Sequence, residues 1–238
     1  VGLGSSGRLV AAIASAINEI YGNPIPKLDL IRFLAQNHGE ETEFINMLSP
    51  VQCMGGSASA GLSDGGMKII LGDSRIIKTM NFPGGYKIVI GIPSDYSPPT
   101  SDKALDMELK HINGFVRCGE KYGKSIAYRI LHEVLPAMEK KDLETIGNLI
   151  YDYRFNMGSI RNCSFLYPKL VDKAKLLSFL KTEKIAPILS LSSVGPAFFA
   201  ITKEEQKCIK VFEEAGFKTL PTKIVNNGYK IKLNSSSR

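Results

Sequence analysis

The chain opens with VGLGSSGRLVAAIASAI, residues 1 to 17, a glycine- and serine-rich loop that runs directly into a helix of small and apolar residues. Glycines let the backbone approach a ligand closely, and the free N–H groups at the start of a helix attract negative charge. Serine hydroxyls add hydrogen-bond donors. The stretch therefore predicts a phosphate cradle made of Gly2, Leu3, Gly4, Ser5, Ser6 and Gly7. The alternative is a glycine that starts the helix without a ligand.

Two well-known glycine loops do not fit this stretch. Gly2, Gly4 and Gly7 have the spacing of the dinucleotide fingerprint, but that motif requires a strand after the first helix and an acidic residue about 20 positions on. Here residues 22–24, Gly-Asn-Pro, end the helix, and a second helical pattern follows over 28–42. A Walker loop is excluded because no Gly-Lys-Ser/Thr follows the glycines.

Composition indicates a globular chain with an anionic ligand. The 238 residues are 44% hydrophobic and 22% charged, with a formal net charge of +7, which suits one large or two modest domains. The lysines are scattered over helical segments such as 169–184 and form no arginine-rich or aromatic-interleaved block. We therefore expect a small-molecule partner rather than a nucleic acid.

Neither a zinc site nor a membrane span is expected. The four cysteines lie far apart without a CxxC pair, and the three histidines have no ligand spacing with them. No apolar run reaches about 18 residues, and the start lacks the basic region of a signal peptide. These features favour a reduced, cytoplasmic protein without a membrane partner. The sequence leaves undecided whether the protein forms a homodimer.

Periodicity outlines the remaining elements. The small-residue run 49–66 is expected to be a loop, and a Pro-Gly-Gly break at 83–85 is the best domain boundary. The β pattern predicts strands at 67–71, 75–82, 86–93, 186–191 and 197–201, and a terminal hairpin that pairs 217–225 with 229–233. The helical pattern predicts helices at 103–118, 122–139, 142–156, 168–183 and 203–216.

Three segments resemble the GHMP kinases, which include galactokinase, homoserine kinase and mevalonate kinase. GLGSSG (2–7) and its alanine-rich helix are similar to the GLGSSAA loop of that superfamily. SSVGPAFFAI (192–201) is similar to its late glycine motif between two strands. GGSASAGLSDGG (55–66) falls where these enzymes carry a Gly/Ser segment near the active site. The three segments occur in the family's order.

The segments resemble two different branches of the superfamily, and the sequence does not decide between them. SSVGP and the first loop and helix look most like the archaeal-type branch named for beta-ribofuranosylaminobenzene-5'-phosphate synthase, which joins phosphoribosyl diphosphate to an aromatic acid. GGSASAG looks more like the loops of mevalonate-type kinases and decarboxylases. Family members also carry several strands and a first motif before the phosphate loop, so an N-terminal portion is expected to precede Val1.

The resemblance implies an α+β, two-domain fold. Residues 1–82 would be the remainder of the N-terminal α/β domain, which binds ATP or phosphate, and 83–238 a ferredoxin-like C-terminal domain. It also implies a transferase: an ATP- and Mg²⁺-dependent kinase acting on a small metabolite, with phosphoribosyl diphosphate and Mg²⁺ as the alternative. A non-catalytic ligand-binding relative is the third reading.

The resemblance also implies roles for individual residues. The backbone from Gly2 to Ser6 would wrap the phosphates, and a serine hydroxyl, Ser6 or Ser5, would help to hold Mg²⁺. Asp64 is the candidate catalytic base or metal ligand, although it could simply cap a turn. Arg8 either meets a second anionic group or is a surface residue. Substrate contacts are expected from Arg8, Ser57, Ser59, Ser192, Ser193 and Gly195. The alternatives are that Ser57 and Ser59 are small residues that serve packing, and that Gly195 serves only the reversal of the chain.

Overall fold

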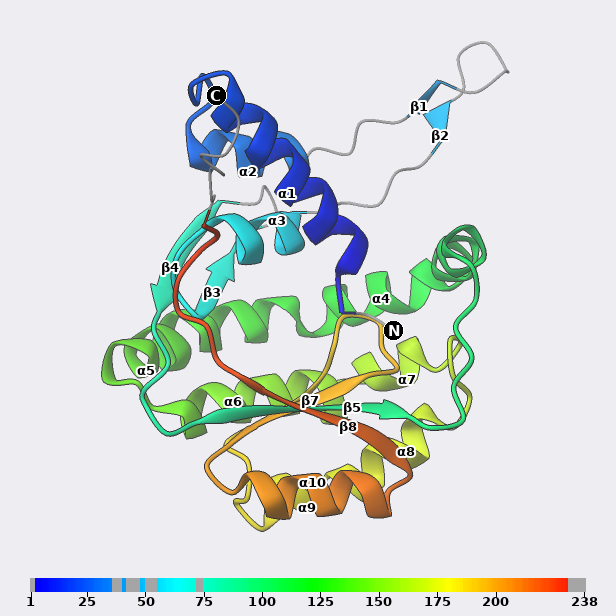
Figure 1. Ribbon diagram of the computed structural model, residues 1–238. Helices are drawn as coiled ribbons and strands as arrows, with labels where there is room; N and C mark the ends of the chain where they lie inside the picture. Colours follow the sequence, from blue (N-terminus) through cyan, green and yellow to red (C-terminus); the bar gives the residue numbers. More distant parts are fainter. Residues whose placement is uncertain (1–2, 36–39, 42–47, 50–54, 72–74, 231–238) are drawn as a thin grey trace. The chain divides into compact units, whose positions relative to one another are not determined.

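The computed structural model describes residues 3–35, 40–41, 48–49, 55–71 and 75–230 (Figure 1). The chain divides into two compact units, one formed by Pro83–Ile224 with Leu3, the other by Gly4–Phe82 with the segment from Val225 onward. Helices combine with antiparallel sheets, which confirms the predicted α+β class. The predicted domain limits of 1–82 and 83–238 stay a prediction.

The unit of Gly4–Phe82 begins with two helices, α1 (Ser5–Ile20) and α2 (Lys27–Ala35). Helix α1 ends where the sequence predicts, because Gly22 and Asn23 both have left-handed backbone angles, φ 79° and 58°. The Asn18 side chain closes the turn to α2, since its Nδ2 donates to the Ile25 carbonyl at 2.9 Å and its Oδ1 accepts from the Ile25 amide at 3.1 Å.

The same unit contains α3 (Gly55–Leu62) and two antiparallel pairs. Strand β1 (Glu40–Glu41) pairs with β2 (Leu48–Ser49), and β3 (Met67–Ile70) pairs with β4 (Ile76–Met80). Helix α3 packs against α1 and α2 around a buried cluster of Ala11, Leu30, Ile31, Ala58 and Leu62. A second apolar stripe of α1 is exposed, and it consists of Leu9, Val10, Ile13, Ile17 and Ile20.

Two expectations about this unit are wrong in part. Residues 55–62 form a helix rather than a loop, because the short side chains of Ala58 and its neighbours let α3 approach α1 and α2 closely, and this packing outweighs the low helix propensity of glycine and serine. The helix expected over 28–42 ends at Ala35, and Glu40–Glu41 is a strand. Residues 36–39, 42–47 and 50–54 lie outside the described part.

The unit of Pro83–Ile224 is built on one antiparallel sheet with the strand order β6-β7-β5-β8. Its strands are β5 (Lys87–Pro93), β6 (Ile188–Leu191), β7 (Phe198–Thr202) and β8 (Phe217–Lys223). Helices connect β5 to β6, and α10 (Glu205–Glu214) connects β7 to β8. Two interleaved βαβ connections on an antiparallel sheet are the ferredoxin-like arrangement that was predicted.

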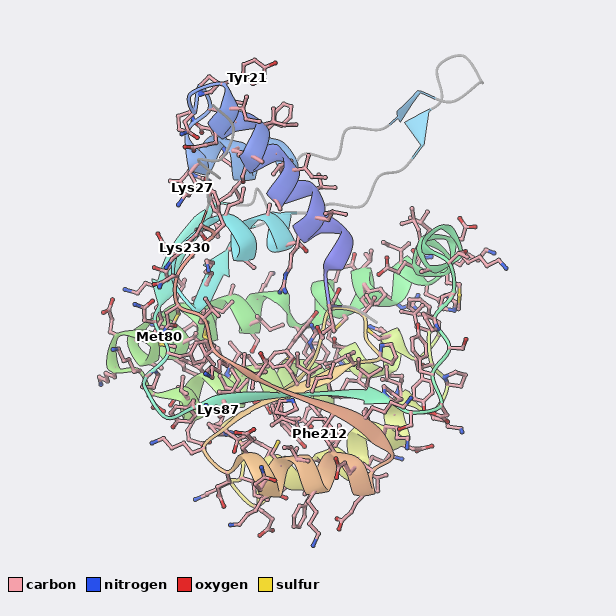
Figure 2. All side chains as sticks on the ribbon, in the orientation of Figure 1. Tyr21, Lys27, Met80, Lys87, Phe212 and Lys230 are labelled. Atoms are coloured by element: carbon pink, nitrogen blue, oxygen red, sulfur yellow. The ribbon has the colours of Figure 1, made fainter. Side chains whose placement is uncertain are left out.

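The core of this unit packs side chains of the strands against those of α10 and of the helices that precede β6. In the register, Lys87 of β5 is opposite Thr202 of β7 and Lys223 of β8. Phe212 of α10 is fully buried next to the sheet (Figure 2), and a Cβ added at Gly91 would come within 2.2 Å of its ring. Strand β5 can therefore carry only glycine where this ring lies.

A long helical segment separates β5 from β6. It comprises α4 (Ser101–Arg129), the π-helix η1 (Ile130–Val134), α5 (Leu135–Lys140), α6 (Leu143–Tyr151), the π-helix η2 (Asp152–Asn156), α7 (Ser159–Cys163), α8 (Leu170–Leu177) and α9 (Phe179–Thr182). The break expected between 118 and 122 is absent, and α4 runs without interruption through Gly119 and Gly123. No neighbouring atom lies within 4 Å of a Cβ added at either glycine. None of the helices in the described part of the chain combines the length and apolar character that a membrane crossing needs.

The predicted terminal hairpin is wrong in the described residues. Strand β8 pairs with β5, and residues 224–230 form no strand. Instead, the Phe82 amide donates to Asn226 Oδ1 at 3.0 Å, and the Gly65 amide donates to the Asn226 carbonyl at 2.7 Å. These bonds, together with the one from the Gly228 amide to Asp64, hold the residues of the expected turn and outweigh the local Asn-Gly turn signal. Residues 231–238 lie outside the described part.

Candidate functional site

The loop ahead of α1 has the backbone of an anion-binding helix terminus. Gly4 precedes the helix in a left-handed conformation, φ 67°, and has no side chain with which to cap it. The first helical bond runs from the Arg8 amide to the Gly4 carbonyl at 3.1 Å, so the amides before Arg8 make no bond of this helical kind. The first turn contains no acidic residue. The terminus is therefore electropositive.

Helix α3 lies directly against this loop. A Cβ added at Gly4 would come within 2.8 Å of Ser57 Oγ, so only glycine fits both the backbone angle and the space. The structure thus brings together Gly4 and Ser57, two of the residues predicted from separate segments. Gly7 is buried, Leu3 is half-buried and Arg8 is exposed. Gly2 lies outside the described residues, and Ser5 and Ser6 form the first residues of α1.

Ser59 lies inside the unit rather than on an open surface. Its side chain is fully buried, and its hydroxyl has no hydrogen-bond partner among the described residues. Its carbonyl accepts from the amide and the hydroxyl of Ser63, at 3.2 Å and 2.6 Å. An unpaired buried hydroxyl typically costs about 1–3 kcal/mol.

Asp64 follows α3 and is exposed. Its Oδ1 accepts a hydrogen bond from the Gly228 amide at 2.6 Å, so the carboxylate anchors the C-terminal segment. Burial lowers the pKa of the nearby Lys68 amine, while the charge of Asp64 opposes this shift. The Lys68 ammonium donates to the Gly65 carbonyl. The geometry gives Asp64 an anchoring contact, and its role in chemistry stays a prediction.

Ser192, Ser193 and Gly195 form the tight turn between β6 and β7. Ser193 and Gly195 are left-handed, φ 53° and 88°, and the Ser192 amide donates to the Ala197 carbonyl at 2.8 Å. A Cβ at Gly195 would come within 2.8 Å of Leu191. This turn belongs to the unit of Pro83–Ile224, whereas Gly4, Ser57, Ser59 and Asp64 belong to the other unit.

Sequence reasoning missed a pocket in the unit of Pro83–Ile224. Its volume is about 610 Å³, and its lining includes Lys110, Arg117 and Arg161. The sequence does not single out these cations, because their residue types and spacing resemble those of any exposed helix. Within the described residues, no three His, Cys, Asp or Glu side chains gather in a way that could hold a metal ion.

Comparison with known proteins supports the fold. Residues 1–47 match the family model described as the GHMP kinases N terminal domain. The structure of mevalonate pyrophosphate decarboxylase from Streptococcus pyogenes is similar with a TM-score of 0.63 at 13% identity, over 96% of this chain and 67% of that one. Homoserine kinase from Cytophaga hutchinsonii is similar with a TM-score of 0.57 at 19% identity, over 96% and 67%.

A third similar structure is described as MDDEF in complex with MVAPP, AMPPCP and magnesium, with a TM-score of 0.55 at 16% identity, over 95% of this chain and 67% of that one. A sequence search of curated proteins returned no match. This chain therefore has a GHMP-kinase-like fold and spans about two thirds of the length of these structures. The likeness to the ribosyl-transfer branch stays a prediction.

Proposed function

We propose that this chain is part of a GHMP-superfamily transferase that binds ATP with Mg²⁺ at the start of α1 and transfers the terminal phosphoryl group to a hydroxyl of a small metabolite. The observation that carries the proposal is the electropositive terminus of α1, with a left-handed Gly4 held against Ser57. Phosphoryl transfer depends mainly on positioning and charge neutralisation, which such a terminus provides.

The residues present fit a nucleotide phosphate. Glycine at position 4 leaves its backbone open to close approach, and the first-turn amides and helix dipole favour an anion. The family match covers this segment, and a structure of similar fold is described as a complex with AMPPCP and magnesium. Mg²⁺ takes most of its ligands from phosphate oxygens and water, so one serine hydroxyl, Ser6 or Ser5, suffices from the protein.

The remaining roles follow the resemblance. The backbone of residues 2–7 holds the phosphates, and Asp64 accepts the proton of the substrate hydroxyl. When bound, ATP with Mg²⁺ supplies the phosphoryl group. Substrate contacts are proposed for Arg8 and Ser57 in the unit of Gly4–Phe82, and for Ser192, Ser193 and Gly195 in the unit of Pro83–Ile224. The fully buried Ser59 side chain is assigned to packing instead.

Calorimetric titration with ATP and Mg²⁺ tests the cradle. Gly4→Ala adds a Cβ against Ser57 Oγ and should weaken ATP binding at least tenfold. Gly22→Ala is the matched control, because Gly22 is also left-handed, at the other end of α1, but has open space around it. It should leave the affinity within about twofold. A folded parent protein that binds no ATP, or equal losses in both variants, would refute the proposal.

Substitutions at Asp64 separate its two candidate roles. Asp64→Asn keeps an oxygen acceptor for the Gly228 amide but removes the base, so turnover should fall by at least about 100-fold with little change in the unfolding midpoint. Asp64→Ala removes both and should also lower the midpoint. Unchanged turnover in Asp64→Asn would eliminate Asp64 as the base.

Product analysis identifies the chemistry, since a kinase releases ADP and a ribosyl transferase releases diphosphate.

A further inference from the structure

The pocket in the unit of Pro83–Ile224 lies between α4 and the segment that contains α7. Lys110 and Arg117 are two helical turns apart on α4, so they lie on the same face of the helix, and Arg161 comes from α7. All three side chains line the pocket and belong to exposed residues. The lining contains no carboxylate, so three positive charges share one concave surface.

Within the part of the chain that the structure describes, no acidic partner explains the placement of these three cations. None makes an ion pair with any residue that the structure describes. Arg129, at the end of the same helix, shows the contrast, since its guanidinium pairs with Glu133 at 2.9 Å and with Asp152 at 2.8 Å. Unpaired like charges around one cavity repel one another, and a bound anion would relieve that repulsion.

The walls of the pocket are held in place without a ligand. Asn162 Nδ2 donates to the Gly114 carbonyl at 2.9 Å and joins α7 to α4. The close approach uses a glycine, because a Cβ at position 114 would come within 2.9 Å of Asn162 Oδ1. The ring of His111 from α4 also stacks on the ring of Phe165, which follows α7, with the centroids 4.6 Å apart and an interplanar angle of 9°. The cavity is therefore preformed, which lowers the entropic cost of binding.

We propose that this pocket binds a small ligand that carries a phosphate or diphosphate group. Two guanidinium groups can each bind phosphate oxygens in a bidentate manner, and the lysine adds a point charge. Three positive charges match the charge of a phosphate ester or diphosphate better than that of a single carboxylate. Asn113 and Ser164 add polar groups to the lining, and about 610 Å³ is enough for a phosphorylated metabolite. The proposal uses none of the residues of the proposed ATP cradle.

Calorimetry of the full chain with inorganic pyrophosphate tests the site. Arg117→Gln/Arg161→Gln removes both guanidinium groups, and Arg32→Gln/Lys124→Gln is the control that removes the same charge elsewhere. We expect saturable binding in the parent, a loss of at least tenfold in the pocket variant, and a change within about twofold in the control. The replaced side chains belong to exposed residues, so unfolding midpoints should stay close to that of the parent.

Two further measurements place the bound anion. The Gly4→Ala variant should still bind pyrophosphate, and the backbone amide NMR signals of Gly114 and Asn162 should shift on titration. The proposal is overturned if the parent shows no saturable binding, if both double variants lose affinity equally, or if binding depends on Gly4 alone. Citrate that binds as tightly as pyrophosphate would overturn the phosphate assignment.

Discussion

At the residue scale, Gly147 of α6 lies against the backbone that leads into β6. A Cβ at this position of α6 would lie 1.8 Å from the Pro187 carbonyl oxygen, which belongs to the backbone and cannot rotate away. Gly147→Ala should therefore lower the free energy of unfolding by about 3 kcal/mol, at the upper end of the usual overpacking effect. Urea denaturation measures this change.

Gly119→Ala is the matched control for this prediction. Gly119 lies within α4 with no atom within 4 Å of an added Cβ, so alanine should raise the free energy of unfolding by up to about 1 kcal/mol through its helix propensity. Equal effects of the two substitutions would contradict the packing argument.

At this scale, the sequence identifies candidate residues better than it predicts the contacts that each of them makes. Gly4 is predicted only to let the backbone approach a ligand closely, and its left-handed φ and its contact with Ser57 come from the structure. The two alternatives for Asp64 could not be separated, because the amide that it binds comes from residue 228. The basic pocket could not be predicted, since paired and unpaired cations look alike in sequence.

At the element scale, Asp142 starts α6. Its Oδ1 accepts from the amides of Glu144 and Thr145, each at 3.1 Å, and its Oδ2 accepts from the Thr145 hydroxyl at 2.6 Å. Asp142→Ala should lower the free energy of unfolding by about 1 kcal/mol, the usual effect of losing such a cap. Asp142→Asn keeps an acceptor and should lose less, which urea denaturation of both variants can check.

An ion pair in the loop after β5 should make the free energy of unfolding depend on pH in the acid range. Hydrogen bonds from Lys169 and Tyr167 lower the pKa of Asp95 to about 2, at distances of 2.7 Å and 2.6 Å. The ordinary value is about 4, so the stabilising contribution is present above about pH 4 and is lost as the pH falls toward 2. Asp95→Asn should flatten this part of the curve of unfolding free energy against pH. An unchanged curve would show that these bonds contribute nothing.

The hydrogen bond between Tyr167 and Asp95 also affects stability at high pH, where the free energy of unfolding should fall as the pH rises. Burial, together with the hydrogen bond to Asp95, raises the pKa of Tyr167 to about 12. The protonated phenol stabilises the fold fully below about pH 10, and this contribution is lost as the pH rises through 12. Tyr167→Phe should remove this alkaline dependence in the same denaturation series.

Elements with strong periodicity are predicted well, and elements set by distant contacts are not. The apolar spacing predicts α1 and the β branching predicts β5, and both are confirmed. The helix α3 could not be predicted, because its glycines and serines favour a loop until α1 and α2 pack against them. The last hairpin is wrong because Asn226 and Gly228 bond to residues more than 140 positions earlier, which no local turn signal reveals.

At the scale of the whole molecule, the unit of Pro83–Ile224 has a core of its own. Every member of its main buried cluster lies between Val89 and Phe217, and the cluster includes Phe198 and Phe212. A fragment of residues 83–224 should therefore unfold cooperatively in urea and give dispersed amide NMR signals. Phe212→Ala in this fragment should remove about 3–5 kcal/mol. A non-cooperative transition of the parent fragment would contradict the prediction.

The α+β, two-domain, GHMP-kinase-like fold could be predicted because three short segments resemble the motifs of that superfamily and occur in the same order. The comparisons bear out this fold class. The order of the strands required the coordinates, since β5 pairs with both β7 and β8 and neither is its neighbour in sequence.

The two outer strands of the four-stranded sheet differ in how they are protected. Strand β6 is buried along its length, and α6 packs against it. Among the described strands, β8 has a neighbour on one side only, and it carries Lys218, Pro221 and Lys223. Proline cannot donate to an incoming strand, and lysines repel a second copy of the same edge. Replacing these three side chains with valine or threonine should leave the fold intact and expose an edge that favours pairing with a second copy, so aggregation should increase.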